Sequence, residues 1–463
     1  MNLRQKINDC LKNNDFVQSY TLCDQLLILE PNDHHLQAVK GWCLYQNDDI
    51  EGAERLIDEA FYRQPSNKEI VTLAFSFYMA IPNHRKLIKM AQRCMAFHLS
   101  DRLCWHRLGT AHFYIGEYDS SVFAFRRSLE IEDNPKSSFG LSQPLLCQGH
   151  YEEGFQRYEE RFNANRSINW IQCEKLPMPK WQGELLAGKS ILIWSEQGLG
   201  DSIQFSRLLT VLSEQDAIVD LMLQPQHISL HGILSTVKGI NNISVVAGNK
   251  VSLQRRYDFH CPMMSVMGLL QITPMTIPAV KAYISPPVSQ KAKWSTYKEL
   301  PKKKVGIVWT TVLSDRFIKE SPIYAAEKIK KSIPLTLLEP LFTLPTYCFF
   351  PLQLSISEDD SQILSQYPNI YDVSKDLTNF SDTAGIIDEM DVVMSIDTAV
   401  AHLSAAMGKR TINLLPYVSD WRWQQNREDT PWYPSMTLCQ QVFEGNWDQV
   451  VDKLLLLLEQ EVV

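Results

Sequence analysis

The hydrophobic period of this 463-residue chain changes near Lys189, and that change limits what the chain can fold into. Before it, apolar residues recur at three and four spacings with breaks at a regular interval, which predicts stacked helical hairpins. After it, strand-like apolar runs alternate with helical stretches, which predicts parallel sheets with helices on both faces. The expected fold class is an all-α solenoid followed by α/β domains.

The helical part shows a tetratricopeptide-like period. Pro31 and Pro65 are 34 residues apart, with Gly41 on an expected first helix and Ala53 on a second. The pattern returns over residues 105–128, and small residues let two helices approach closely. Stacked hairpins leave a concave groove that commonly holds a peptide or protein segment. A rigid spacer or a dimerisation surface is the alternative.

The α/β part contains two sets of strand-like runs, which predicts two doubly wound halves. A stretch rich in Pro and Gly, residues 163–188, has the composition of a linker and precedes the first set. We therefore predict a helical domain over residues 1–165 and α/β domains over 166–300 and 301–463. The expected strands are SILIWS and AIVDLML in the first half, and KKKVGIVWT, TYCFFPLQL, NIYDVS, MDVVMSI and RTINLLP in the second.

Composition excludes several classes of protein. The net charge of −8 argues against a nucleic-acid partner, because backbone phosphates are bound by clustered Lys and Arg. Ten scattered cysteines form no C-x-x-C pair, so neither a zinc site nor a disulfide framework is indicated. No run approaches eighteen apolar residues and the N-terminus lacks an apolar leader segment. We expect a soluble, cytoplasmic protein without a membrane span.

The segment SIDTAVAHLSAAMG, residues 395–408, has the build of an anion site. An apolar strand delivers Asp397 and Thr398 to the start of a helix, and His402 lies one turn further on the same face. Unpaired N–H groups and the positive end of the helix dipole attract phosphate, such as the tail of a nucleotide. Alternatively, Asp397 only caps the helix, Thr398 is solvated and His402 is a satisfied core histidine.

A second motif, SEQGLGDSIQFSR, follows the first strand of the first half. Gly198 and Gly200 allow a tight turn, and Asp201 starts the helix at the carboxyl end of a strand, where open α/β sheets place their sites. The third glycine of a dinucleotide fingerprint is absent, which speaks against an epimerase or dehydrogenase. A simple helix cap is the alternative role of Asp201.

These two motifs, with SDTAGIIDEMD between them and DWRW and PWYPSM downstream, resemble bacterial tetratricopeptide-repeat glycosyltransferases whose catalytic half is related to the ADP-heptose heptosyltransferases. The resemblance implies a GT-B pair of Rossmann-like domains that uses a nucleotide-sugar donor. It implies that Asp201 is the general base that deprotonates the acceptor hydroxyl. Glu196 and Gln197 flank the same loop, and they either line the acceptor pocket or, for Glu196, replace Asp201 as the base.

The resemblance also implies a phosphate-binding set. The helix that opens at Asp397 and Thr398, together with His402, would provide fixed donors that meet the negative charge growing on the departing phosphate. The family's usual cationic stretch is altered here, but Arg316 and Lys331 are retained, and either could neutralise the phosphate without a metal. A solvated loop is the alternative for both cations. No metal and no cofactor besides the donor are expected.

Aromatic residues crowd the segment that follows the anion motif. They either stack on a base or sugar or fasten the two lobes together, and we favour fastening. Arg422 and Arg427 either reach an anionic donor group or pair with Glu428 or Asp429. Asp382 is expected to cap its helix beside the base pocket. The aromatic set comprises Trp421, Trp423, Trp432 and Tyr433.

The expected function is an inverting, metal-independent transfer of a sugar to a Ser or Thr hydroxyl of a protein that the repeats present. Relatives of this architecture make flagellin the leading candidate acceptor. The donor is open between a nucleoside diphosphate sugar and a CMP-linked sugar. Two alternatives remain: a repeat scaffold whose transferase half is inactive, and a heptosyltransferase that acts on a glycolipid.

Overall fold

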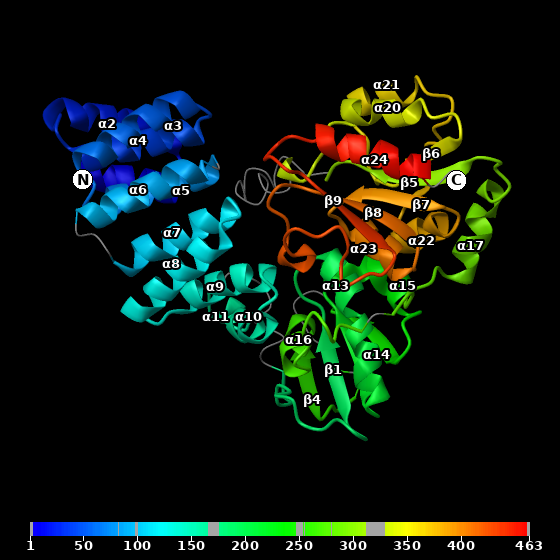
Figure 1. Cartoon of the computed structure of the whole chain (residues 1–463). Coiled ribbons are helices and arrows are strands. Elements are labelled where there is room, and N and C mark those ends of the chain that lie inside the picture. The colour runs from blue at the N-terminus through cyan, green and yellow to red at the C-terminus, as the bar shows by residue number, and fades with distance from the viewer. Residues whose placement is uncertain are drawn as a thin grey trace. The chain divides into compact units, whose positions relative to one another are not determined.

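The computed structural model describes residues 3–81, 83–97, 101–164, 176–246, 253, 255–278, 280–311 and 329–460. The described residues divide into two compact units, those up to Leu141 and those from Ser142 onward. The first unit is helical, and the second contains two parallel sheets (Figure 1). Helices followed by two parallel α/β sheets confirm the predicted fold class.

The helical unit is a series of antiparallel hairpins. Hairpins α3–α4 and α7–α8 coincide with the two copies of the period identified in the sequence, and hairpin α5–α6 lies between them. The helices of this unit are α1 (Leu3–Lys12), α2 (Phe16–Leu29), α3 (His34–Gln46), α4 (Ile50–Arg63), α5 (Lys68–Ala80), α6 (His84–Ala96), α7 (Arg102–Tyr114), α8 (Tyr118–Ile131) and the first half of α9 (Pro135–Cys147).

Helices α2 to α7 share one device that fixes where they begin. Each follows an Asp or Asn whose side chain accepts a hydrogen bond from a backbone N–H of the first turn, which satisfies one of the donors that a helix start leaves unpaired. The caps are Asp15, Asp33, Asp49, Asn67, Asn83 and Asp101.

Glycines set the distance between paired helices. A Cβ built on Gly41 would lie 2.8 Å from Ile57 Cγ1, and one built on Gly109 would lie 2.9 Å from two ring carbons of Phe125. Gly140 meets the other edge of the same ring, at 2.6 Å. The predicted close approach of the helices is therefore confirmed.

The first sheet of the second unit is parallel, with strand order β3-β2-β1-β4. The helix predicted over residues 202–213 forms as two consecutive helices that meet at Ser206. The elements are β1 (Ser190–Trp194), α13 (Leu199–Phe205), α14 (Arg207–Glu214), β2 (Ile218–Leu223), β3 (Ile240–Val245) and β4 (Phe259–Pro262).

The second sheet is also parallel, with strand order β6-β5-β7-β8-β9. Strands β6 and β7 are buried along their length, as their continuous apolar runs predict. The strands are β5 (Lys303–Val308), β6 (Tyr347–Pro351), β7 (Val392–Ile396), β8 (Arg410–Leu415) and β9 (Met436–Gln440), and the main helices are α22 (Phe380–Asp388), α23 (Ala399–Ala406) and α24 (Asp448–Gln460).

Two strand assignments in this sheet need correction. NIYDVS was expected to form a strand, but it makes only an isolated bridge between Phe349 and Ile370 and then enters a 3-10 helix, η5 (Ser374–Asp376). Strand β9 was not predicted, because it follows the aromatic segment without the long apolar run of its neighbours.

Shorter helices complete the second unit. Helices α10 and α11 belong to this unit, so the helical unit ends at Leu141, earlier than the boundary expected at residue 165. These elements are α10 (Tyr151–Tyr158), α11 (Arg161–Ala164), η1 (Pro225–Leu230), α15 (His231–Leu234), η2 (Met263–Ser265), α16 (Val266–Leu269), α17 (Val288–Trp294), η3 (Ser295–Tyr297), η4 (Leu335–Leu338), α20 (Glu339–Phe342), α21 (Glu358–Leu364) and η6 (Trp421–Trp423).

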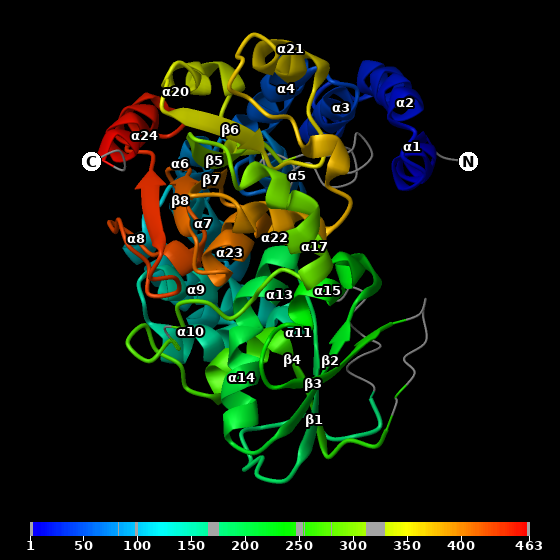
Figure 2. The same cartoon turned by 90° about the vertical axis from the view of Figure 1, so that its right-hand side faces the viewer.

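Helix α13 of the first α/β half and helix α23 of the second lie next to each other (Figures 1 and 2). Across the described part of the chain, the helices are too short or too polar to cross a bilayer.

The Gly109–Phe125 contact gives a test of the helical packing. Gly109→Ala should destabilise the helical unit by about 1–3 kcal/mol, because overpacking a close contact costs more than the helix propensity that alanine returns. Phe125→Leu removes ring atoms, so it should cost less in the Gly109→Ala background than in the wild type. Urea unfolding of the four proteins measures this coupling, and additive effects would contradict the contact.

Candidate active site

The two motifs singled out in the sequence meet at one point of the structure. Gly198 precedes α13 at the end of the β1 loop, and Thr398 precedes α23 at the end of β7. A Cβ built on Gly200 would lie 2.8 Å from His402 Cδ2 and 3.6 Å from Ala399 Cα. Only a glycine allows this approach without displacement, so the GLGD turn is shaped to fit the start of α23.

Asp201 is held by its own helix and by the opposite half. Its Oδ2 accepts the Gly198 N–H at 2.7 Å, and its Oδ1 accepts a hydrogen bond from the Arg422 guanidinium. The side chain keeps 17% exposure. Asp201 therefore caps the turn, as one alternative held, and still presents a carboxylate between the halves.

Arg422 is a buried charged residue that joins the halves. Besides Asp201, it donates to Asp420 Oδ1 at 2.7 Å and to Gln204 Oε1 at 2.6 Å. Burial alone would lower the pKa of its guanidinium, but Asp420 and Asp201 raise that pKa above its ordinary value. Of the expected surface pairing with Glu428 or Asp429, Arg427 pairs with Asp429 at 2.9 Å, whereas Arg422 pairs with Asp420 and Asp201 instead.

The start of α23 carries an ion pair. Lys331 Nζ donates to Asp397 Oδ2 at 2.7 Å. Burial would raise the pKa of Asp397, but the Lys331 ammonium holds it below its ordinary value. Thr398, not Asp397, is the N-cap residue, and its hydroxyl shares a 3.0 Å hydrogen bond with Ser395. Lys331 thus lies where the sequence placed it, whereas Arg316 lies outside the described residues.

His402 is buried in this contact, with 5% exposure. Its Nδ1 shares a 2.9 Å hydrogen bond with the Tyr433 hydroxyl, and its ring stacks on Trp423 at a centroid distance of 5.3 Å. Burial lowers its pKa to about 3, so the imidazole is neutral near pH 7. A neutral imidazole can donate a hydrogen bond to a phosphate but adds no positive charge to the site.

Polar residues at the ends of β5 and β6 were missed in the sequence. The Thr310 hydroxyl donates to Ser332 Oγ at 3.1 Å, next to Lys331, and Gln353 Oε1 accepts the Thr310 N–H at 3.2 Å. The rule that singled out Asp397, a polar residue directly after an apolar strand, also applies to Thr310 and could have found it. These groups line the same carboxyl edge of the second sheet as Asp397.

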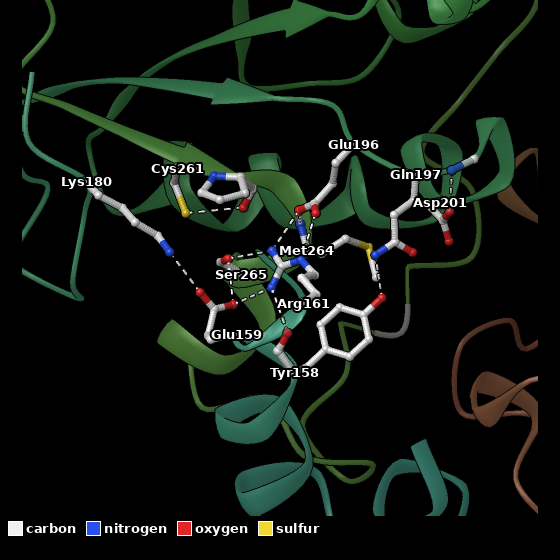
Figure 3. Close-up of polar contacts among 12 residues, drawn as sticks. Tyr158, Glu159, Arg161, Lys180, Glu196, Gln197, Asp201, Cys261, Met264 and Ser265 are labelled. Atoms are coloured by element: carbon white, nitrogen blue, oxygen red, sulfur yellow. Dashed lines mark hydrogen bonds and ion pairs between the residues drawn. The ribbon is translucent and has the colours of Figure 1, made fainter. Parts of the chain in front are cut away.

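Glu196 is 1% exposed and lies in a buried ion pair with Arg161 (Figure 3). Its Oε2 accepts Arg161 Nε at 2.8 Å, and its Oε1 accepts Arg161 Nη2 at 2.9 Å and the Met264 N–H at 2.9 Å. Both carboxylate oxygens are therefore engaged within the protein. No pattern in the sequence points to Arg161, because its partner lies 35 residues away beyond the predicted linker.

Glu159 extends this network. It accepts from Arg161 Nη1 at 2.8 Å and from Lys180 Nζ at 2.8 Å. Burial alone would raise its pKa, but the two cations lower it to about 2. The pairs are balanced, so the network contains no isolated buried charge.

Gln197 is fixed by contacts on both sides of its backbone. Its side-chain amide donates to the Tyr158 hydroxyl, and its carbonyl oxygen lies 3.0 Å from His227 Nε2. Asp382 is held elsewhere in the second unit, by Lys293 of α17 at 2.7 Å and by Thr378. Burial would raise the pKa of Asp382, but these partners lower it. The cap of its helix is Asn379.

The aromatic residues after the anion motif are buried and pack against the first half. Trp421 stacks on Phe205 of α13 at 6.4 Å, and Trp432 meets the same ring edge-on at 5.6 Å. Phe155 of α10 contacts Trp421 at 5.5 Å. The favoured role of these residues, fastening the lobes, is confirmed. Their exposures are 2% for Trp421, 0% for Trp423, 0% for Trp432 and 1% for Tyr433.

Within the described residues, no group of three or more His, Cys, Asp and Glu side chains is arranged to hold a metal ion. The positive charge beside the start of α23 comes from Lys331.

Comparison with known proteins agrees with the resemblance. Residues 376–451 match the model of glycosyltransferase family 9, the heptosyltransferases. The chain carries a heptosyltransferase-related glycosyltransferase segment. That segment contains β7, α23 and η6, and so includes Asp397, His402 and Arg422.

Longer matches cover more of the chain. Protein FlbA of Caulobacter vibrioides is 24% identical over 379 residues, which are 76% of this chain and 60% of FlbA. The chain thus spans about 60% of the length of that relative.

Two solved structures are similar in part. The glycosyltransferase family 9 structure from Veillonella parvula overlaps 60% of this chain and 99% of its own, with 10% identity and a TM-score of 0.44. MamA from Desulfovibrio magneticus overlaps 36% of this chain and 94% of its own, with 14% identity and a TM-score of 0.31.

The buried imidazole predicts a pH dependence. The pKa of His402 falls from 6.5 to about 3 on folding. The folding free energy contributed by the neutral imidazole is therefore fully present above pH 6.5 and is lost as the pH falls toward 3. The cost is about 1.4 kcal/mol per pH unit, or about 3 kcal/mol between pH 6.5 and pH 4.5.

His402→Gln removes this titration. Urea unfolding of the α/β unit, followed at several pH values, should show a flatter pH dependence for the variant. His260, whose pKa is lowered to about 4, contributes equally to both proteins and cancels in the comparison. Identical slopes would show that His402 is accessible to protons in the folded state.

Proposed function

We propose that this protein is an inverting, metal-independent glycosyltransferase that moves a sugar from a nucleotide-sugar donor to a Ser or Thr hydroxyl of a protein. One observation carries the proposal: the loop that bears Asp201 packs against the start of α23, which follows Asp397, and the Lys331 ammonium from another segment pairs with Asp397. A carboxylate able to take a proton thus lies across from a helix start whose N–H groups, with the adjacent Lys331 ammonium, are able to take a phosphate.

The donor phosphate is assigned to the carboxyl edge of the second sheet. The N–H groups that begin α23 and the Lys331 ammonium both attract negative charge. Thr310 and Thr398 add hydroxyl groups at the ends of β5 and β7. These donors are fixed before the reaction, so they stabilise the charge that develops on the departing phosphate.

Asp201 is assigned as the base that deprotonates the acceptor hydroxyl. The hydroxyl proton passes to the carboxylate, the acceptor oxygen bonds to the anomeric carbon, and the bond from that carbon to the phosphate oxygen breaks. Attack from the face opposite the phosphate inverts the anomeric centre. Arg422 and the Gly198 N–H each use one oxygen of Asp201, and each carboxylate oxygen has a second acceptor site for the hydroxyl.

Glu196 is a less suitable base. Its oxygens are occupied by Arg161 and Met264, and its side chain is 1% exposed. We therefore assign proton transfer to Asp201 and give Glu196 a role in holding the loop.

The acceptor is proposed to be a protein segment bound by the helical hairpins. Arrays of this kind present a concave face to extended peptides, and an array of repeats has no evident use in an enzyme that modifies lipid. Flagellin in the cytoplasm is the proposed acceptor on the basis of the family resemblance. A scaffold with an inactive transferase half would retain peptide binding but would release no nucleotide.

Asp201→Asn tests the proposed base. Nucleotide release would be measured with ADP-, UDP-, GDP- and CMP-linked sugars and flagellin as acceptor. The variant should lose about a hundredfold or more in kcat, because general-base catalysis contributes about 10²–10⁴. Asparagine can still accept the Gly198 N–H, so the turn should persist.

Asp216→Asn is the matched control. Asp216 is exposed at the end of α14 with a φ of +62°, a conformation that asparagine also tolerates, so this variant should keep wild-type rates. Wild-type turnover in Asp201→Asn would remove Asp201 from the mechanism, and absence of nucleotide release from the wild type with every donor would favour the scaffold.

A further inference from the structure

The loop between β1 and α13 adopts a backbone conformation that is unfavourable for one of its residues. Gln197 has a φ of +48°, in the left-handed region that non-glycine residues seldom adopt. Such a conformation costs free energy and persists only where surrounding contacts hold it. Asp201 lies four residues further along, so whatever holds Gln197 also places the carboxylate.

The main contacts to this loop come from α10 and α11. Arg161 makes a two-point ion pair with Glu196, and its Nη2 also donates to Ser265 Oγ at 2.8 Å. The Arg161 and Glu196 side chains are 2% and 1% exposed. A pair this deep is sensitive to geometry, because removing one partner leaves the other charge buried without compensation.

The second contact is neutral. Tyr158, the last residue of α10, points its hydroxyl at the Gln197 side chain and accepts a hydrogen bond from the amide (Figure 3). On the opposite side, His227 contacts the Gln197 carbonyl oxygen at 3.0 Å and the Ser195 hydroxyl at 2.7 Å. The loop is thus held between η1 of its own domain and the helices that precede the sheet.

We propose that Tyr158 and Arg161 are positioning residues for sugar transfer, which hold Glu196 and Gln197 and through them set the place of Asp201. Neither residue touches the proposed acceptor or donor. The assignment of Asp201 as base rests on the proposed function, whereas the effect on the loop does not. The helices that end the hairpin series therefore form part of the transferase.

Helices α10 and α11 cluster with the sheets rather than with the helical unit. If these helices only had to pack against the sheet, apolar side chains would suffice, because they are often as stabilising as a buried ion pair or more so. The ion pair and the hydroxyl specify one loop geometry, and that specificity is the property a positioned base requires.

Tyr158→Phe is the mildest test, because it removes one oxygen atom and keeps the ring. Hydrogen exchange of peptides covering residues 195–205 in the full-length protein should rise about fivefold, the factor that corresponds to the loss of one net hydrogen bond. Tyr347→Phe is the matched control, because its hydroxyl donates at 2.6 Å to the Leu458 carbonyl oxygen in the second sheet. The control should leave exchange of the 195–205 peptides unchanged.

Arg161→Met removes the ion pair, with Arg255→Met as its control. Arg255 pairs with the buried Asp220 at 3.1 Å in the same sheet, away from the loop. Arg161→Met should increase exchange over residues 195–205 and lower kcat at least about tenfold with an unchanged KM for the donor. Arg161→Lys keeps the charge and should recover part of both losses, whereas Arg255→Met should change neither.

The two readouts separate the inference from the proposed function. Equal loop exchange in Tyr158→Phe and Tyr347→Phe would overturn the inference, whether or not the enzyme is active. A folded Arg161→Met with wild-type kcat would overturn it as well. If the wild type transfers no sugar but loop exchange responds as expected, the proposed function fails while the positioning of the loop stands.

Discussion

A buried cation, Arg422, ties the proposed base to the opposite α/β half. The positive charge of the Arg422 guanidinium is balanced by Asp420 in the second half and by Asp201 in the first. Its Nε donates a hydrogen bond to Gln204 of α13. A buried arginine without these partners would be prohibitively costly. The proposed base is thereby tied to the half that carries the proposed phosphate site, and the two motifs cannot move independently without breaking the pair.

Aromatic side chains surround this cation and strengthen its electrostatic interactions. The Arg422 guanidinium lies 4.6 Å from the Trp421 ring centroid and 5.3 Å from that of Phe205. Apolar rings exclude water, so charges inside interact more strongly than at an exposed surface. The same surroundings keep His402 neutral. Burial and charge pairing are therefore parts of one arrangement.

Local rules found the parts of the site that local sequence determines. Asp201 and Asp397 each follow an apolar strand and lie at or just before the first turn of a helix, so both could be placed at a sheet edge. Partners could not be found this way: the Arg422–Asp201 pair spans 221 residues and has no period. Arg161 was missed for the same reason, because it lies before the predicted linker and its partner Glu196 lies after it. Strand β9 was missed because a short strand with mixed residues has no distinctive pattern.

The most direct test of the account is hydrogen exchange of the full-length protein with saturating ADP, UDP, GDP or CMP. Amides protected by a bound phosphate tail exchange more slowly. The account predicts protection by at least one nucleotide in peptides covering residues 329–332 and 396–402, where Lys331 and the start of α23 lie. Protection confined to other segments, or none with any of the four nucleotides, would contradict it.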